Sequence, residues 1–240
     1  MATTATGHAG HRLEEPIVPS SHPGPPDHLD APLEVAPQDW TPRDVYFLLT
    51  GLVVPRPIAW VSTYGPDGVR NVAPHSFFNV VAHEPPHVVF SSTSEKDTLR
   101  NIRERGEFVV NLVTMDLVEE MNFTATDFPP DEDEFTWADL TVAAAAVVDA
   151  PRVAEAHAHL ECRLVEEVRA GNGHLVIGEV VHLHVDPSVW QDGRVDPQRL
   201  DPVCRLAGTG YATLGEVFHL PRRRWDDVRG TAPGEAVPRR

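Results

Sequence analysis

Two groups of polar side chains interrupt the apolar runs of residues 71–114. The first group, "APHSFFN", offers three side chains that can hydrogen-bond a ligand, namely His75, Ser76 and Asn79. The second group, "SSTSEKDT", offers hydroxyls, one ammonium group and a carboxylate, on Ser91, Ser92, Lys96, Asp97 and Thr98. Each group follows a predicted strand, where backbone amides also leave the hydrogen-bond ladder.

The second group has the chemistry of an anion site. The residues "DTLRNIRERGEF" predict a helix with Asp97 as its N-cap, so the first helical amides and the positive end of the helix dipole would lie beside the hydroxyls. Lys96 is the only lysine in the chain, and Arg56, between two prolines, would add positive charge. An ordinary capped loop, in which Asp97 and Thr98 only cap the helix, explains these residues as well, and the residues alone leave both interpretations open.

A ligand with a phosphate at one end and a flat, heteroatom-edged ring at the other would use both groups. Flavin mononucleotide (FMN) fits this description, with its phosphate at the second group and its ring edge at the first. The residues Trp60, Phe77 and Phe78 could form aromatic walls, although each is also typical of a core.

A metal site is the main alternative. In "VHLHV", His182 and His184 are two residues apart on a predicted strand and therefore share one face. The nearest further ligands, Glu179 and His174, stand at no recognisable metal-binding spacing, and an outward or interface face of a barrel would show the same alternation. We therefore predict no metal, and we interpret His157 and His159 in the same way.

Composition excludes several other classes. The formal charge of -16 opposes binding to nucleic acid and to anionic membranes. Two cysteines, Cys162 and Cys204, form no disulfide framework or CxxC site, and no signal or membrane-spanning stretch is present, so we expect a cytoplasmic protein. The motifs GxGxxG, GxxxxGK[ST], HExxH and GxSxG are also absent.

The elements that position these residues are mostly strands. A helix is predicted over residues 41–51 with Thr41 as N-cap, then a hairpin of residues 57–64 and 69–74 around "GPDG". Further predictions are a strand at 85–93, the helix from Asp97 to Gly106, a strand at 108–114, a helix at 115–128, an acidic connection, a weak strand at 140–148 and two long β runs joined by "GNG". Hairpin connections favour a closed antiparallel barrel. Residues 1–41 are predicted to be a disordered proline-rich arm, 42–221 the folded domain and 222–240 a flexible basic tail.

The ordered segments "RPIAWVST", "APHSFFN", "EPPHVVFSS" and "KDTLRNI", together with "HLECRLVEE" and "RLAGTGYATLGEVF", resemble the flavin reductase-like family. The resemblance covers residues 55–221. It implies a mostly β fold, a six-stranded antiparallel split β-barrel, with FMN bound near the interface of a homodimer. Carried over by position, Ser76 and Asn79 would face the flavin ring, and Ser91, Ser92, Lys96 and Thr98 would hold the ribityl chain and phosphate, with Arg56 a further candidate. In that family an aromatic residue often stands at the position of His75, and a glycine at that of Ala207.

The same resemblance implies hydride transfer from NADH or NADPH to flavin, with a downstream electron acceptor as a further partner. Some members instead use a tightly held FMN to pass electrons without turning over a pyridine nucleotide. Hydride transfer between stacked rings depends on position and on exclusion of water, so we expect no catalytic acid or base.

Overall fold

The computed structural model describes residues 25–232, and its contacts divide the chain into one unit ending at Val54 and a second beginning at Pro55. In the first unit, η1 (Pro37–Asp39) precedes helix α1 (Pro42–Leu52). The predicted N-cap is confirmed, because the hydroxyl of Thr41 accepts a hydrogen bond from the Asp44 amide. The helix runs one residue past Gly51, which does not terminate it. Residues 1–24 of the predicted arm lie outside the described residues, and the domain bounds remain predictions.

The second unit is built on one antiparallel sheet of seven strands in the order β3-β2-β6-β9-β10-β5-β4. Its strands are β2 (Ala59–Tyr64), β3 (Arg70–His75), β4 (Phe78–His83), β5 (Pro86–Ser92), β6 (Glu107–Leu112), β9 (Ala158–Ala170) and β10 (Gly173–Val185). The predicted mostly β fold with hairpin connections is confirmed. The predicted closed, six-stranded barrel is wrong in detail, because the sheet has seven strands and no ladder within residues 25–232 joins β3 to β4.

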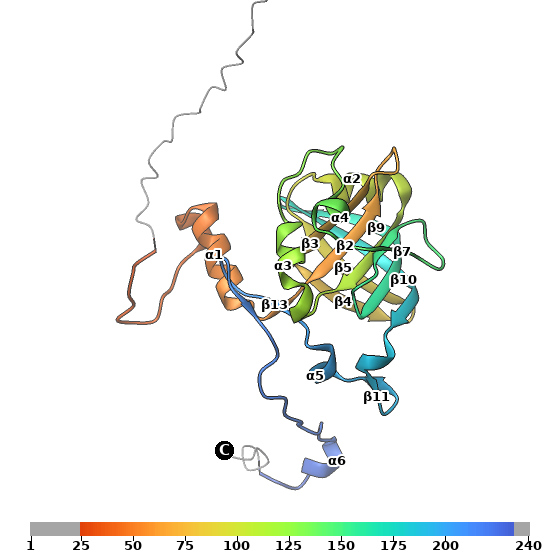
Figure 1. The fold of residues 1–240 in the computed structure, drawn as a ribbon. Coiled ribbons are helices and arrows are strands. Elements are labelled where there is room, and N and C mark those ends of the chain that lie inside the picture. Colours follow the sequence, from red (N-terminus) through yellow and green to blue (C-terminus); the bar gives the residue numbers. More distant parts are fainter. Residues whose placement is uncertain (1–24, 233–240) are drawn as a thin grey trace, which may run out of the picture. The chain divides into compact units, whose positions relative to one another are not determined.

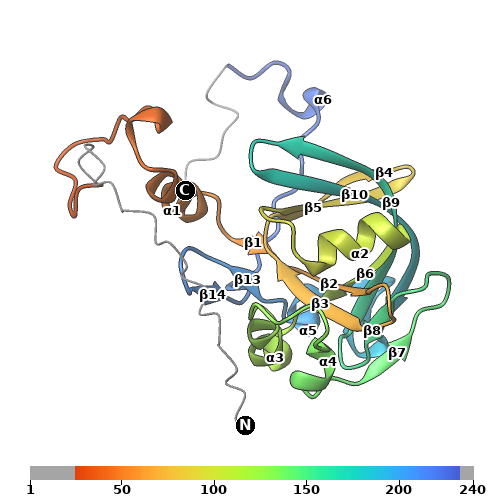
Figure 2. The same ribbon diagram turned by 90° about the horizontal axis from the view of Figure 1, so that it is seen from above.

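The two edges of this sheet nevertheless meet at one corner. Strands β3 and β4 are at opposite edges, yet only Ser76 and Phe77 separate them in the chain. The sheet must therefore curl until its edges come together at this turn, which is the arrangement of a split barrel. Helix α2 (Asp97–Arg105) lies across one end of the curled sheet (Figures 1 and 2).

Two apolar clusters share strand β2, which is buried on both faces. Ala59 and Val61 belong to the inner cluster, which also contains Phe90 and Phe108 of the sheet and Leu99 and Ile102 of helix α2. Trp60 belongs to the outer cluster, beneath η2 (Met115–Leu117), α3 (Val118–Phe123) and α4 (Glu134–Trp137). Its indole nitrogen donates to the Thr124 hydroxyl at 2.9 Å, so Trp60 is a core residue and not a wall of a ligand site.

Small elements complete the second unit. The strands β1 (Arg56–Pro57), β13 (Cys204–Arg205) and β14 (Tyr211–Ala212) form a second sheet, and β7 (Val142–Ala144) with β8 (Pro151–Val153) and β11 (Trp190–Gln191) with β12 (Arg194–Val195) form two hairpins. The helices η3 (Pro187–Val189), α5 (Pro197–Leu200) and α6 (Trp225–Val228) are short.

Several predicted bounds change. The strand predicted at 140–148 is only β7, the helix predicted at 115–128 ends at Phe123, and α6 lies inside the predicted tail, of which residues 233–240 fall outside the described part. Within residues 25–232, no helix has the length and apolar character needed to cross a bilayer.

Candidate functional site

The corner between β3 and β4 brings the two polar groups of the sequence together. The carbonyl of Phe77, in the first group, accepts a hydrogen bond from the Ser91 amide of the second at 2.8 Å. The ring of His75 stacks at a tilt on Phe90, with 4.6 Å between ring centres. The turn after β3 and the end of β5 therefore form one surface.

His75 is held neutral at this corner. Its Nε2 is shielded from solvent and has no hydrogen-bond partner among residues 25–232. The pKa of His75 is lowered to about 4, mainly by burial and also by the positive charge of Lys96, while a hydrogen bond with the Ser91 backbone acts in the opposite direction. The unpartnered Nε2 is a polar atom that a ligand could satisfy.

The serines at the end of β5 differ in their freedom to bind a ligand. A Cβ at Gly173 of the neighbouring strand would lie only 2.9 Å from the Ser91 hydroxyl, so the glycine leaves room for that group. The Ser92 hydroxyl instead donates to the Ser94 carbonyl at 2.7 Å, and Ser92 is buried. Of the two predicted ligand hydroxyls, Ser91 is the one that is not committed to its own loop.

The start of helix α2 differs from the prediction by one residue. Lys96 and not Asp97 is the N-cap, and no side chain caps the helix there. Asp97 is the first helical residue, and its carboxylate pairs with Arg100, so the prediction that Asp97 caps the helix is wrong. The uncapped first amides and the helix dipole leave this end electropositive.

The ammonium group of Lys96, at this end of α2, is already paired with a carboxylate. Its Nζ donates to Oδ1 of Asp127 at 2.6 Å, and both side chains are exposed. This hydrogen bond lowers the pKa of Asp127. An anion binding to Lys96 would have to replace Asp127 or share the ammonium group with it.

Thr98 faces the interior. Its hydroxyl donates to Oδ1 of Asn71 at 2.9 Å, and the Asn71 amide donates to Glu134 at 2.8 Å. Burial raises the pKa of Glu134. The hydroxyl of Thr98 is therefore part of a buried network, and its backbone amide lies at the helix start. That Thr98 holds phosphate stays a prediction, for which the amide is the more suitable group.

The other predicted residues surround the corner. Arg56 is buried on β1, donates to the Leu206 carbonyl at 2.8 Å, and places its guanidinium 5.9 Å from the centre of the Phe77 ring. Ser76 is half-buried in the turn itself. Asn79 is exposed on β4, where its Oδ1 accepts from the Val80 amide.

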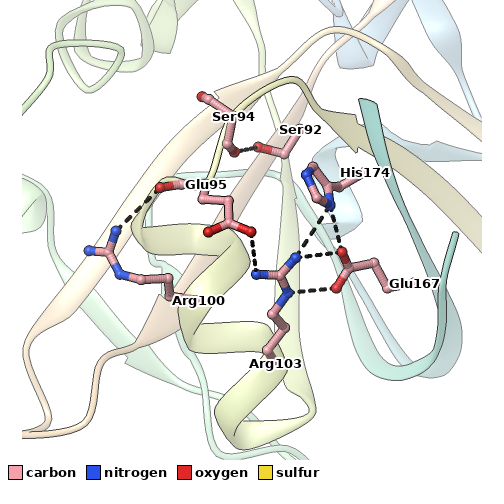
Figure 3. Close-up of polar contacts among 7 residues, drawn as sticks. All are labelled: Ser92, Ser94, Glu95, Arg100, Arg103, Glu167 and His174. Carbon is pink, nitrogen blue, oxygen red and sulfur yellow. Dashed lines mark hydrogen bonds and ion pairs between the residues drawn. The ribbon is translucent and has the colours of Figure 1, made fainter. Parts of the chain in front are cut away.

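One network at this site escaped the sequence prediction. Figure 3 shows Arg103 of α2 between the carboxylates of Glu95 and Glu167, with His174 beside it. Arg103 donates to both oxygens of Glu167, at 2.7 and 2.6 Å, and Nδ1 of His174 lies 2.7 Å from the same carboxylate. Arg103 lowers the pKa of Glu167 to about 2, with a smaller contribution from His174. The network connects α2 to the β9–β10 hairpin. In that hairpin His174, on β10, is paired with Ser92 of the neighbouring strand β5.

A neighbouring cleft is acidic, whereas the start of α2 is electropositive. It is lined by Asn71, Asp97, Arg100 and Glu104 together with residues 129–132 and Glu134. The carboxylates predominate in this lining, so a phosphate is disfavoured there. The anion site is better placed on the side of α2 that faces Lys96 and His75.

The curled seven-stranded sheet with a polar corner at its meeting edges defines a split-barrel protein. It overlays the split barrel domain of a Shewanella frigidimarina protein with a TM-score of 0.72 and 24% identity, over 80% of this chain and 100% of that one.

Residues 51–198 match the flavin reductase like domain, so the chain belongs to the flavin reductase-like family. Component B of nitrilotriacetate monooxygenase from Bacillus cereus is 40% identical, with a TM-score of 0.76 over 80% of this chain and 100% of that chain. An NADH flavin reductase of Kitasatospora aureofaciens is 31% identical over 161 residues, which cover 65% of this chain and 79% of that protein.

Proposed function

We propose that this protein binds FMN at the corner formed by the β3–β4 turn, the end of β5 and the start of α2, and that it reduces flavin with NADH or NADPH. The single observation that carries this proposal is the contact between the two polar groups, made by the 2.8 Å hydrogen bond from the Ser91 amide to the Phe77 carbonyl. Membership of the flavin reductase-like family supports the reaction class.

The residues at the corner fit the two ends of FMN. The uncapped helix start, the Lys96 ammonium and the Ser91 hydroxyl would hold the phosphate. The β3–β4 turn, with Ser76 and the unpartnered Nε2 of His75, would hydrogen-bond the polar edge of the ring. Arg56 would add positive charge behind Phe77.

Bound FMN supplies the hydride acceptor, so the protein's task is to position the rings and exclude water. The network of exposed Arg103, half-buried Glu167 and buried His174 connects α2 to β10, and so helps to fix the helix start relative to the end of β5. We assign no acid or base to the transfer. The electron acceptor that follows flavin stays a prediction, as does the cytoplasmic location inferred from the free thiols of Cys162 and Cys204.

The phosphate contact is tested by FMN titration, followed through quenching of flavin fluorescence. Lys96→Ala should weaken binding by about 1.5–3 kcal/mol, roughly 10- to 150-fold, because it removes a charged hydrogen bond to phosphate. Asp127→Asn should tighten binding a few-fold, because it removes the competitor.

The control is Arg194→Ala, which removes the same charge from an exposed residue of β12. If Lys96→Ala and Arg194→Ala bind FMN with the affinity of the wild type, the phosphate does not lie at α2.

The reaction is tested separately, by the oxidation of NADH and of NADPH with added FMN. A flavin reductase turns over many equivalents of one of these nucleotides. A protein that binds FMN but shows no such turnover is an electron-transfer protein, the alternative that the resemblance leaves open. The turnover measurements distinguish a flavin reductase from an electron-transfer protein. Their outcome does not change what the FMN titration says about the position of the phosphate.

We also propose that the protein is a homodimer with FMN near the interface. Strand β4 is an edge of the sheet, and its Val80 and Val81 are 65% and 55% exposed. Exposed apolar residues on an edge strand favour pairing with another copy. Sedimentation equilibrium should give twice the chain mass, and Val80→Lys with Val81→Lys should shift the protein towards monomer; a monomeric wild type would refute the dimer.

A further inference from the structure

Strands β9 and β10 bring together three metal-binding side chains at the end of the hairpin remote from its turn. Their register places Glu161 opposite His182 and His159 opposite His184. One ligand atom each of Glu161, His182 and His184 lies within 4.8 Å of the others. Ligand atoms around a tetrahedral Zn²⁺ are roughly 3.4 Å apart, so small side-chain rotations would close the set around one ion.

The carboxylate of Glu161 is already fixed for this role. It is fully buried, its Oε1 accepts from the Ala146 amide at 2.6 Å, and its Oε2 accepts from the amides of Val147 and Val148 at 2.8 and 3.2 Å. Its remaining contact is between Oε1 and Nε2 of His184. Outer hydrogen bonds of this kind orient a metal ligand, and an ion would replace the direct contact between His184 and Glu161.

The neighbouring side chains define the rest of the site. His184 and His182 are half-buried, with ring centres 4.7 Å apart, so an ion can reach them from solvent. His159 is directed elsewhere, because its Nε2 lies 2.7 Å from the Val153 carbonyl and its Nδ1 lies 3.5 Å from the Arg152 guanidinium. Three protein ligands therefore remain, and a fourth position is left for water.

We propose that Glu161, His182 and His184 bind one divalent transition-metal ion of the zinc type, at a site separate from the flavin corner. Two imidazoles and one carboxylate select Zn²⁺, Co²⁺, Ni²⁺ or Cu²⁺ over Mg²⁺ and Ca²⁺, which prefer oxygen ligands. His174 at the corner and His184 are ten residues apart on β10, which is roughly 30 Å along a strand. The role proposed for the ion is structural: through Glu161 it holds residues 146–148 to the hairpin.

The test uses full-length protein freed of metal by a chelator. Titration with Co²⁺, followed by its visible absorption bands, and with Zn²⁺ in a calorimeter should each show one high-affinity equivalent. The variant His182→Gln should bind at least tenfold more weakly, because it removes one of three ligands. At the same concentration Zn²⁺ should also raise the thermal midpoint of the wild type by more than that of the variant.

The control variant is His83→Gln, on the exposed part of β4, which should bind both ions with the affinity of the wild type. Circular dichroism of His182→Gln establishes that the variant is folded, and His182 is a suitable target because it is half-buried, whereas Glu161 is in the core. The proposal is overturned if the wild type binds no stoichiometric ion, or if folded His182→Gln binds with unchanged affinity.

Discussion

The neutral histidine at the corner predicts how stability depends on pH. The change to make is His75→Gln, which keeps a polar side chain but cannot titrate, together with His75→Phe, which keeps an aromatic ring against Phe90 and cannot titrate. Both variants remove the proton-binding group. If buried, neutral His75 lowers stability in acid, both variants should lose less stability than the wild type between pH 7 and pH 5.

The size of the effect follows from the shift of this one group. The pKa of His75 falls from an ordinary value of 6.5 to about 4 on folding. Because the folded value is the lower one, its contribution is fully present above pH 6.5 and is lost as the pH falls towards 4, when the unfolded chain takes up a proton that the folded chain refuses. The full difference is about 3 kcal/mol, and about 2 kcal/mol of it is lost between pH 7 and pH 5.

The measurement is urea unfolding at pH 7 and pH 5 for the wild type and both variants. The wild type should lose about 2 kcal/mol more than either variant over this interval. At pH 7, His75→Phe should also be more stable than His75→Gln by about 1–2 kcal/mol, because only the glutamine leaves a polar group at a site without a partner. Equal losses in all three proteins would show that His75 titrates normally and that the corner is open to water.

Two further substitutions test the packing and the polar network around the sheet. Gly178→Ala should lower the free energy of unfolding by about 1–3 kcal/mol, because the added Cβ would lie 2.5 Å from Cζ of Phe108. Denaturant melts measure this change, and an unchanged free energy of unfolding would mean that the Phe108 ring moves aside freely. Glu167→Gln should lower the free energy of unfolding at pH 7, and the difference from the wild type should shrink as the pH falls towards 2. Arg103 lowers the pKa of the Glu167 carboxyl group, which therefore stabilises the protein only while it is ionised. A difference that does not depend on pH between 7 and 3 would contradict this.

The features that sequence predicted well are local. The hairpin around residues 65–68 needs a positive φ, and Gly68 supplies it at 78°. Helix α2 ends where Gly106 adopts a left-handed conformation, with φ of 71°. In each case the residue that decides the structure lies within a few positions of the structure it decides, so a single chain segment carries the information.

The features that sequence missed depend on strand pairing. Glu161 escaped notice as the third member of the metal cluster because it is 21 residues from His182 in the chain and becomes its neighbour only through the β9–β10 register. Two register shifts in that ladder, after Ile177 and Val180, make the pairing harder still to derive. Glu179 and His174 were the nearer candidates in sequence, but sequence distance along a strand does not measure contact across a hairpin.

A sequence motif likewise does not predict the direction in which a side chain points. Thr98 stands in the second polar group by position, yet its side chain is buried and its hydroxyl donates to Asn71 of the neighbouring strand β3. That contact joins residues 27 positions apart in the chain, so the local sequence around the helix start does not reveal it. A family position can therefore be occupied by the expected residue type while the contact it makes is a different one.

The pairing of Lys96 bears on how the corner could hold a phosphate and still release it. An exposed ion pair contributes little, because water and salt screen it and two long side chains must be ordered to form it. A dianionic phosphate at a helix start gains from the dipole, from free amides and from the ammonium group together, so it should displace the Asp127 carboxylate. When the ligand leaves, Asp127 returns to Lys96 and the ammonium group is not left without a counter-charge. At the proposed site Asp127 would thus lower the affinity for FMN, which is why Asp127→Asn is expected to tighten binding.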